Sequence, residues 1–167
     1  MTEGAEPPPE RAASARLSNV PIPEQTLAGV ALGLWWRHRR GRDPVPSGVA
    51  RLSGALTVVA GATLVVQAWR AAGDVRLSEP DAVVRTGPFA HSRNPMYLGW
   101  GLVHLGLATC LRSVELLATI PPAWALLHRQ VLHEEAALEA GLGAEYVRYR
   151  RTVPRYGFGR GPGAGGT

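Results

Sequence analysis

The sequence contains no lysine and only one cysteine, and few of its histidines are close together. All 18 basic residues are arginine, set against 13 acidic residues. With Cys110 alone, a disulfide framework within the chain and a zinc cluster built on thiolates are both excluded. His128 and His133 are five residues apart, so they do not share one face of a helix. We therefore expect no metal, and we expect His104 and Cys110 to serve helix packing.

Several common ligand-binding motifs are also missing. The sequence has no phosphate-binding loop, no dinucleotide-binding glycine motif and no nucleophile elbow of the serine hydrolases. Its arginines gather near the edges of apolar segments instead of along one stripe, so we expect no nucleic-acid partner. What the chain does contain is a series of apolar blocks almost free of charge. Their polar flanks hide them in the mean hydropathy of −0.03.

The two ends of the chain are polar and predict disordered tails. Residues 1–19 hold three consecutive prolines and almost no apolar side chains, so they cannot bury enough surface to offset the entropy of ordering. They also lack the basic start, apolar run and cleavage site of a secretory signal. Residues 157–167 are rich in glycine, which predicts a second flexible tail.

Four apolar segments between the tails predict an all-α integral membrane protein with about four transmembrane helices. The segments are residues 20–36, 49–69, 95–111 and 114–127. A spanning helix needs about 20 mostly apolar residues. Residues 49–69 meet this best, and Gly54 and Gly61 give that segment small surfaces for close helix packing. Prolines crowd the start of residues 20–36, so a count of three helices is the fallback.

The third and fourth segments predict a tight helical hairpin across the bilayer. Only Arg112 and Ser113 separate them. Within the segment of residues 114–127, Pro121 and Pro122 are expected to break the backbone hydrogen bonds of the helix. Twelve arginines fall on the side of the two tails and six on the other, which favours a cytoplasmic location for the tails. The arginine cluster at residues 36–42 points the other way.

The region after the hairpin predicts two short amphipathic helices. Residues 128–140 are good helix formers, Gly141 and Gly143 interrupt them, and a second helix over 144–152 ends before Pro154. One apolar and aromatic stripe follows from helical spacing: Leu138, Leu142, Tyr146, Tyr149 and Val153. We expect this stripe to lie on the headgroup surface of the membrane. A solvated terminal helix without a further role is the alternative.

Folding of the hairpin is expected to bring two polar segments, residues 81–100 and 128–135, to one end of the molecule. The pair Asn94-Pro95 predicts the start of a helix, whose free N–H groups at residues 96–98 suit a carboxylate. A capped membrane entry with interfacial aromatics is the alternative to such a site. The segments would meet at the membrane boundary, open to water on one side.

The adjacent carboxylates Glu134 and Glu135 are the second candidate feature. Neighbours on a helix point about 100° apart, so we expect one to face the site and the other to face water. The inward carboxylate needs a cation, and Arg129 is the nearest candidate on the same helix. An ordinary charged helix face is the alternative.

Four short motifs lie in order around the predicted hairpin. They are Gly87-Pro88-Phe89, Arg93-Asn94-Pro95-Met96-Tyr97, Glu134-Glu135-Ala136-Ala137-Leu138, and Gly143 followed by Tyr146, Tyr149 and Val153-Pro154. Together they resemble the isoprenylcysteine carboxyl methyltransferase family, in its bacterial branch, over residues 74–157. The phospholipid N-methyltransferases belong to the same superfamily. The apolar segments predict two transmembrane helices over residues 20–73, and the resemblance implies a methyltransferase core over residues 74–156.

The resemblance implies an enzyme of the bacterial cytoplasmic membrane with its active site on the cytoplasmic face. It would transfer a methyl group from S-adenosylmethionine to a lipid-like or small amphipathic acceptor, by carboxyl O-methylation. The implied cofactor contacts are Asp81, Ala82, Val83, Val84, Phe89, Asn94, Pro95, Met96, Tyr97 and Glu134. The family's substrate-orienting arginine falls at Gln130, with Arg129 beside it, so both become substrate-binding candidates. Arg129 and Glu134 become the catalytic candidates.

Other functions stay open at this point. A phospholipid-type N-methyltransferase is one; its amine acceptor would have to lose a proton, and Glu134, Glu135, His91 and His133 are the titratable residues near the expected site. A membrane reductase with a nicotinamide cofactor is another, since sterol reductases share a distantly similar C-terminal pattern. A non-catalytic membrane module that keeps the fold is the third.

Overall fold

The computed structural model describes residues 23–41, 47–73, 75 and 82–157. Within these ranges it contains five α-helices and one 3-10 turn, which confirms the prediction of an all-α chain. The predicted tail at residues 1–19 and nearly all of the glycine-rich tail lie outside the described residues. Asp81, one of the implied cofactor contacts, also lies outside them.

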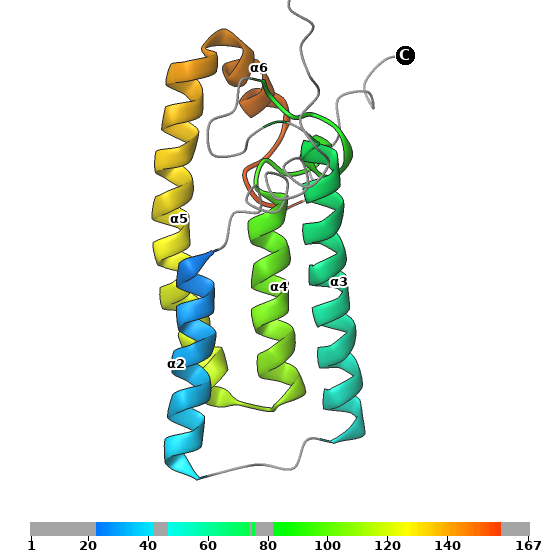
Figure 1. The fold of residues 1–167 in the computed structure, drawn as a ribbon, viewed down its shortest axis with the longest axis vertical. Coiled ribbons are helices and arrows are strands. Elements are labelled where there is room, and N and C mark those ends of the chain that lie inside the picture. The colour runs from blue at the N-terminus through cyan, green and yellow to red at the C-terminus, as the bar shows by residue number, and fades with distance from the viewer. Residues whose placement is uncertain (1–22, 42–46, 74, 76–81, 158–167) are drawn as a thin grey trace, which may run out of the picture.

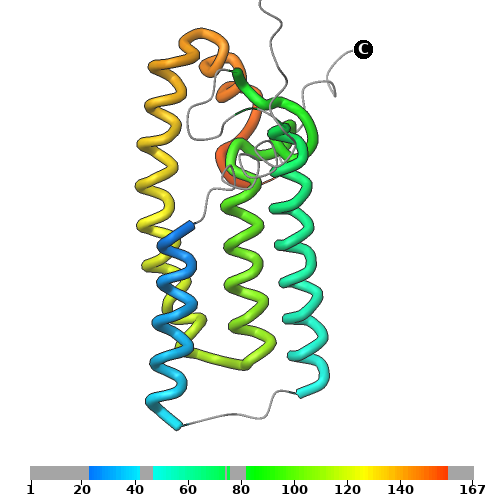
Figure 2. The backbone as a smooth tube through the Cα atoms, viewed as in Figure 1, coloured from blue at the N-terminus to red at the C-terminus, as the bar shows by residue number. Residues whose placement is uncertain are grey.

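Four long helices form an elongated bundle (Figure 1). They are α2 (Glu24–Arg40), α3 (Gly48–Ala72), α4 (Pro95–Cys110) and α5 (Val114–Leu142). Helix α2 packs on α5 and α3 packs on α4, while α4 also contacts α5. The turn η1 (Gly87–Ala90) and the short helix α6 (Ala144–Thr152) gather at one end, where α5 runs past the ends of α2 and α4 (Figure 2).

Glycines bring the backbones of α3 and α4 into direct contact, as their small surfaces predict. A Cβ atom added to Gly61 would lie 2.5 Å from the carbonyl oxygen of Gly99, and one added to Gly99 would lie 2.7 Å from that of Gly61. A Cβ atom on Gly54 would overlap the backbone of Cys110. No side chain fits at these positions, so the two helices form one closely packed pair.

Helix α3 is long and apolar enough to cross a membrane, and it is the one helix among the described residues that meets both conditions. Its outer surface exposes Val49, Leu52, Leu56, Val59 and Val66. Helices α2 and α4 have 17 and 16 residues. At 1.5 Å per residue they are about 24–26 Å long, below the roughly 30 Å of a hydrocarbon core. The bundle thus has the expected four helices, but the expected four membrane spans are not established.

The predicted break at Pro121 and Pro122 was wrong. Helix α5 continues for 29 residues, through both prolines and through Gly141, and joins two segments that were predicted as separate. The prolines lie on the exposed side of the helix, while its buried side packs against α2 and α4 through residues such as Leu116 and Leu127. This tertiary packing outweighs the backbone hydrogen bonds that the prolines remove.

The predicted hairpin between α4 and α5 is confirmed. Arg112 adopts a positive φ of 48° in the turn, and the side chain of Ser113 accepts a hydrogen bond from the amide of Leu116 as the cap of α5. The buried His104 forms a hydrogen bond of 3.2 Å with Thr119, which joins the two helices. His104 is therefore a packing residue, as expected from its isolation.

The structure confirms the extent of α6 but gives its apolar stripe a different role. Tyr146, Tyr149 and Val153 are buried in one cluster, against which Val83 and Leu138 pack. The stripe predicted to lie on the lipid headgroups thus faces the protein itself. This is because the loop before η1 folds onto it and covers the apolar surface first.

Candidate functional site

The candidate site is the end of the bundle where the predicted polar segments meet. The loop over residues 82–94 leads into α4, which begins at Pro95 with Asn94 as its N-cap residue, as predicted. The carbonyl oxygen of Asn94 already accepts a hydrogen bond of 3.2 Å from the amide of Leu98. One of the three amides expected to be free is therefore occupied by the helix itself.

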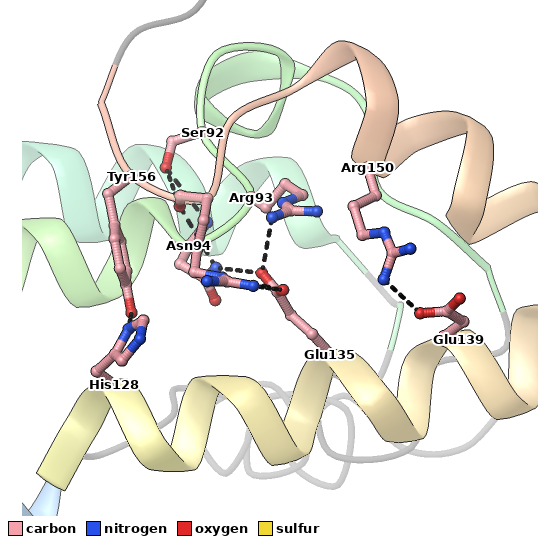
Figure 3. A network of polar contacts seen from close by, with 9 residues as sticks. Ser92, Arg93, Asn94, His128, Glu135, Glu139, Arg150 and Tyr156 are labelled. Atoms are coloured by element: carbon pink, nitrogen blue, oxygen red, sulfur yellow. Dashed lines mark hydrogen bonds and ion pairs between the residues drawn. The ribbon is translucent and has the colours of Figure 1, made fainter.

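Glu135 lies at the centre of a buried charged cluster (Figure 3). Only 5% of this residue is exposed. Its Oε2 accepts hydrogen bonds of 3.0 and 2.8 Å from Nε and Nη2 of Arg155. Its Oε1 lies 3.3 Å from Nη2 of Arg93 and accepts a hydrogen bond of 3.3 Å from Nδ2 of Asn94. We call these four residues the Glu135 cluster; it joins the loop, α5 and the C-terminal segment.

The C-terminal segment over residues 153–157, which we call the strap, closes over this end of the bundle. The carbonyl oxygen of Pro154 accepts a hydrogen bond of 2.9 Å from the amide of Arg93. Tyr156 shares a hydrogen bond of 3.0 Å with Nδ1 of His128, and its ring packs on Trp124 at 5.0 Å between centroids. The strap is thus fixed by backbone, charged and aromatic contacts at once, and Figure 3 shows the contact of Tyr156 with His128.

Arg93 keeps two donors without a partner inside the Glu135 cluster. Its side chain is 7% exposed, and none of the described residues provides a hydrogen-bond partner for its Nε and Nη1. The cluster also contains two arginines against one glutamate, so its formal charge is positive. Buried donors without partners are costly. An anionic group, such as a carboxylate, is the ligand that would satisfy them.

A second polar chain, which we call the Glu134 cluster, joins α4, α5 and α2. Oε1 of Glu134 accepts hydrogen bonds of 2.8 Å from the hydroxyl of Tyr97 and of 2.8 Å from Nε2 of Gln130. Oε1 of Gln130 in turn accepts a hydrogen bond of 2.7 Å from Nε2 of Gln25. The Oε1 atom of Gln25 is buried and has no partner within the part of the chain that the structure describes. This cluster therefore ends in a free acceptor, in contrast to the free donors of Arg93.

Comparison with known proteins identifies the family. The model of the family described as phospholipid methyltransferase matches residues 49–145, more than half of the chain. The chain belongs to the phospholipid methyltransferase family. No curated protein and no solved structure matches it. The family implies a methyltransferase, and the apolar helix α3 agrees with a membrane location.

The family match covers most of the candidate site, but not all of it. It includes the loop, the start of α4 and both adjacent glutamates. It excludes Gln25 on α2 and the strap with Arg155 and Tyr156. The match supports the broad family and does not single out the isoprenylcysteine branch that the four motifs resemble.

The structure assigns the two glutamates of this methyltransferase differently from expectation. Both take part in polar contacts at the site, and neither simply faces water. The buried carboxylate is that of Glu135, and its cationic partners are Arg93 and Arg155. Arg129, the expected partner, is exposed. The prediction erred because it considered only cations on the same helix, whereas these partners come from a loop and from the strap.

The other implied cofactor residues surround the start of α4. Phe89 and Met96 are buried together, and Val84 packs against them. Val83 packs against the tyrosines of α6, while Ala82 is exposed. Their roles in cofactor binding stay predictions. Their positions show that the expected residues lie within one end of the fold.

The tyrosines around the site are hydrogen-bond donors at neutral pH. Burial raises the pKa of Tyr146 to about 12 and also raises the pKa of Tyr149 and of Tyr156. The hydroxyl of Tyr149 donates a hydrogen bond of 2.7 Å to the carbonyl oxygen of Phe89. All three phenols therefore keep their protons in the physiological range, and the hydroxyls of Tyr149 and Tyr156 hold the loop and the strap through their hydrogen bonds.

Sequence reasoning assigned no site role to Arg93, Arg155, Tyr156 and Gln25. The motif that ends in Val153-Pro154 directed attention away from the two residues after it. Gln25 lies 105 residues from its partner Gln130, and no local pattern indicates that pairing. A polar residue in the first turn of an otherwise apolar helix is the one signal that could have indicated it.

Proposed function

We propose that this member of the phospholipid methyltransferase family transfers the methyl group of S-adenosylmethionine to the nitrogen of an amphipathic amine at the membrane boundary. The observation that carries the proposal is the opposite polarity of the two clusters. Free donors of Arg93 lie on one side, and a carboxylate with a free carbonyl oxygen lies on the other. Methyl transfer is a displacement at a sulfonium carbon, so the protein has mainly to position the two reactants and exclude water.

The residues present fit S-adenosylmethionine. Its amino-acid end carries a carboxylate, and the unpartnered Nε and Nη1 of Arg93 are buried donors that suit one. When bound, the cofactor supplies an electrophilic methyl group. Phe89 and Met96, which are buried beside the start of α4, would contact its apolar parts. The strap would exclude water from this end through the packing of Tyr156 on Trp124.

The surroundings of Gln130 favour an amine over a carboxylate as the acceptor. In the resemblance an arginine at this place orients a carboxylate substrate, but here Nε2 of Gln130 already donates to Glu134. Arg129 beside it is exposed. The Glu134 cluster instead presents acceptor atoms, which attract an ammonium group. An amine must lose a proton before it attacks, and the carboxylate of Glu134 is suitably placed to take that proton.

Carboxyl O-methylation is the competing reaction, and one experiment distinguishes the two. The full-length protein is reconstituted in phosphatidylcholine nanodiscs, with S-adenosylmethionine labelled in its methyl group. Dodecylamine and dodecanoate, which have chains of equal length, are offered as acceptors, as are nanodiscs that contain phosphatidylethanolamine. We expect label on the two amines and none on dodecanoate.

Two results would contradict this proposal. Label found only on dodecanoate would assign the reaction to carboxyl O-methylation. Absence of calorimetric binding by both S-adenosylmethionine and S-adenosylhomocysteine would remove the methyltransferase assignment, and NADPH binding would then indicate the reductase. The arginine distribution supports the cytoplasmic side as the location of the site, which we include in the proposal.

A further inference from the structure

Helix α2 lies outside the region that the family model matches, yet it contributes to the Glu134 cluster. Gln25, in the first turn of α2, donates a hydrogen bond of 2.7 Å to Gln130 on α5. The turn is held firmly: Thr26 is 5% exposed, and a Cβ atom on Gly29 would lie 3.2 Å from that of Ala123 on α5. Gln25 is therefore positioned by packing.

The orientation of both glutamine amides follows from Glu134. An ionised carboxylate only accepts hydrogen bonds, so the atom of Gln130 that lies 2.8 Å from it is the amide nitrogen. The oxygen of Gln130 consequently faces Gln25 and requires a donor from it. Gln25 must therefore direct its nitrogen to Gln130, and its own oxygen remains free. The atom of Gln25 without a partner among the described residues is therefore its carbonyl oxygen and not its amide nitrogen.

That carbonyl oxygen is buried, and no described residue donates a hydrogen bond to it. Leaving a buried hydrogen-bond acceptor unpaired is costly, so a ligand that donates a hydrogen bond there removes this cost. The hydrogen bonds to Glu134 converge on its Oε1, and among the residues that the structure describes none donates to its Oε2. The Glu134 cluster therefore contains two hydrogen-bond acceptors, Oε1 of Gln25 and Oε2 of Glu134, that are available to a ligand.

We propose that Gln25 binds the amine that receives the methyl group. Its side-chain carbonyl oxygen accepts a hydrogen bond from an N–H of the amine, while the carboxylate of Glu134 balances the positive charge of the amine. The inference rests on the proposed function and adds a specificity-determining residue from a helix outside the matched region. It requires an amine that keeps at least one N–H. A fully substituted ammonium of the same charge and chain length has no hydrogen to donate and gains nothing from Gln25.

The test measures how tightly two probes bind to the protein in phosphatidylcholine nanodiscs. Binding is monitored by tryptophan fluorescence, with and without S-adenosylhomocysteine. The probes are dodecylamine and dodecyltrimethylammonium, which share chain length and charge but differ in N–H groups. In Gln25→Leu we expect dodecylamine to bind about tenfold more weakly, the effect of one hydrogen bond to a charged group. Binding of dodecyltrimethylammonium should stay unchanged. Gln67→Leu, the same substitution on the exposed surface of α3, is the matched control.

Gln25→Asn provides a second variant, which keeps both an amide donor for Gln130 and a carbonyl oxygen, and it should bind dodecylamine more tightly than Gln25→Leu does. The proposal is overturned if Gln25→Leu binds dodecylamine like the native protein. It is also overturned if Gln25→Leu weakens the two probes equally, since Gln25 then acts only by holding Gln130. Binding of S-adenosylhomocysteine is read separately, so failure of the methyltransferase assignment is distinguishable from failure at Gln25.

Discussion

Glu134 and Glu135 are neighbours with identical side chains, and the fold places them in opposite surroundings. Glu135 is buried, and its two oxygens receive two arginines and an asparagine. Glu134 is half-buried, and a tyrosine and a glutamine donate to one of its oxygens. The carboxylate of Glu135 is surrounded by protein donors and joins separate segments of the chain. The carboxylate of Glu134 can accept further hydrogen bonds and is therefore available to a ligand. Adjacency in the sequence therefore does not imply a shared role.

The largest effect is expected from Glu135→Ala. The substitution leaves Arg93 and Arg155 near one another without a counter-charge, and removal of one partner from a buried ion pair costs about 3–5 kcal/mol. Chemical unfolding in detergent should reveal this loss of stability. The strap should also detach, which trypsin would report by faster cleavage after Arg155. A variant that unfolds like the native protein would contradict the structural role of Glu135.

Glu134→Gln should separate function from stability. The substitution keeps the shape of the side chain but removes the carboxylate that takes the acceptor's proton, so kcat should fall about a hundredfold. The unfolding midpoint should stay near that of the native protein, because the contacts of Glu134 are few and only half-buried. If stability falls as in Glu135→Ala, the two glutamates do not differ in the way described.

Tyr97→Phe should have a smaller effect on the same side of the comparison. The phenylalanine fills the same volume but no longer donates the 2.8 Å hydrogen bond to Glu134. We expect kcat/KM to fall about tenfold, as for one hydrogen bond to a charged group. Tyr149→Phe, whose hydroxyl contacts the backbone of Phe89, is the control and should affect kcat/KM less.

Tyr146 reports on the Glu135 side through its alkaline titration. Burial and the charge of Glu135 raise its pKa in the folded protein to about 12, against an ordinary value of 10.0. Between pH 10 and pH 12 the unfolded chain releases the proton of Tyr146 and the folded chain keeps it. The contribution of Tyr146 to the free energy of unfolding is therefore fully present below pH 10 and decreases as the pH rises toward 12. Tyr146→Phe should make this decrease shallower in unfolding curves measured at successive pH values.

The smallest effect is expected from Arg129→Ala. Arg129 is exposed and belongs to neither cluster. Under the proposed amine acceptor, transfer rates should stay within about twofold of the native rate, as for a surface substitution. A large loss of activity would instead favour the carboxylate acceptor that the family resemblance implies, with Arg129 as its orienting residue.

Local signals predicted the parts of the fold that depend on neighbouring residues. Asn94-Pro95 gave the start of α4, Arg112-Ser113 gave the hairpin, and Pro154 gave the end of α6. The continuity of α5 could not be predicted, because packing against α2 and α4 overrides the local effect of its two prolines.

The polar contacts of the site divide in the same way. The approach of the loop to α5 followed from the hairpin, so contacts such as that of Tyr97 with Glu134 lay within reach of the sequence. The partners Arg155 and Gln25 did not, since each depends on how a separate segment returns to the end of the bundle. Interactions between distant segments are set by the whole fold and have no short motif.

Because α5 is continuous, it moves as one rigid element. Its 29 residues extend for about 43 Å, from the hairpin turn to the polar end beyond α2. Two separate helices would absorb a tilt at their joint, but a continuous helix carries the tilt to its far end. A tilt of α5 at the hairpin end is therefore carried along the helix to Glu134 and Glu135 near its other end.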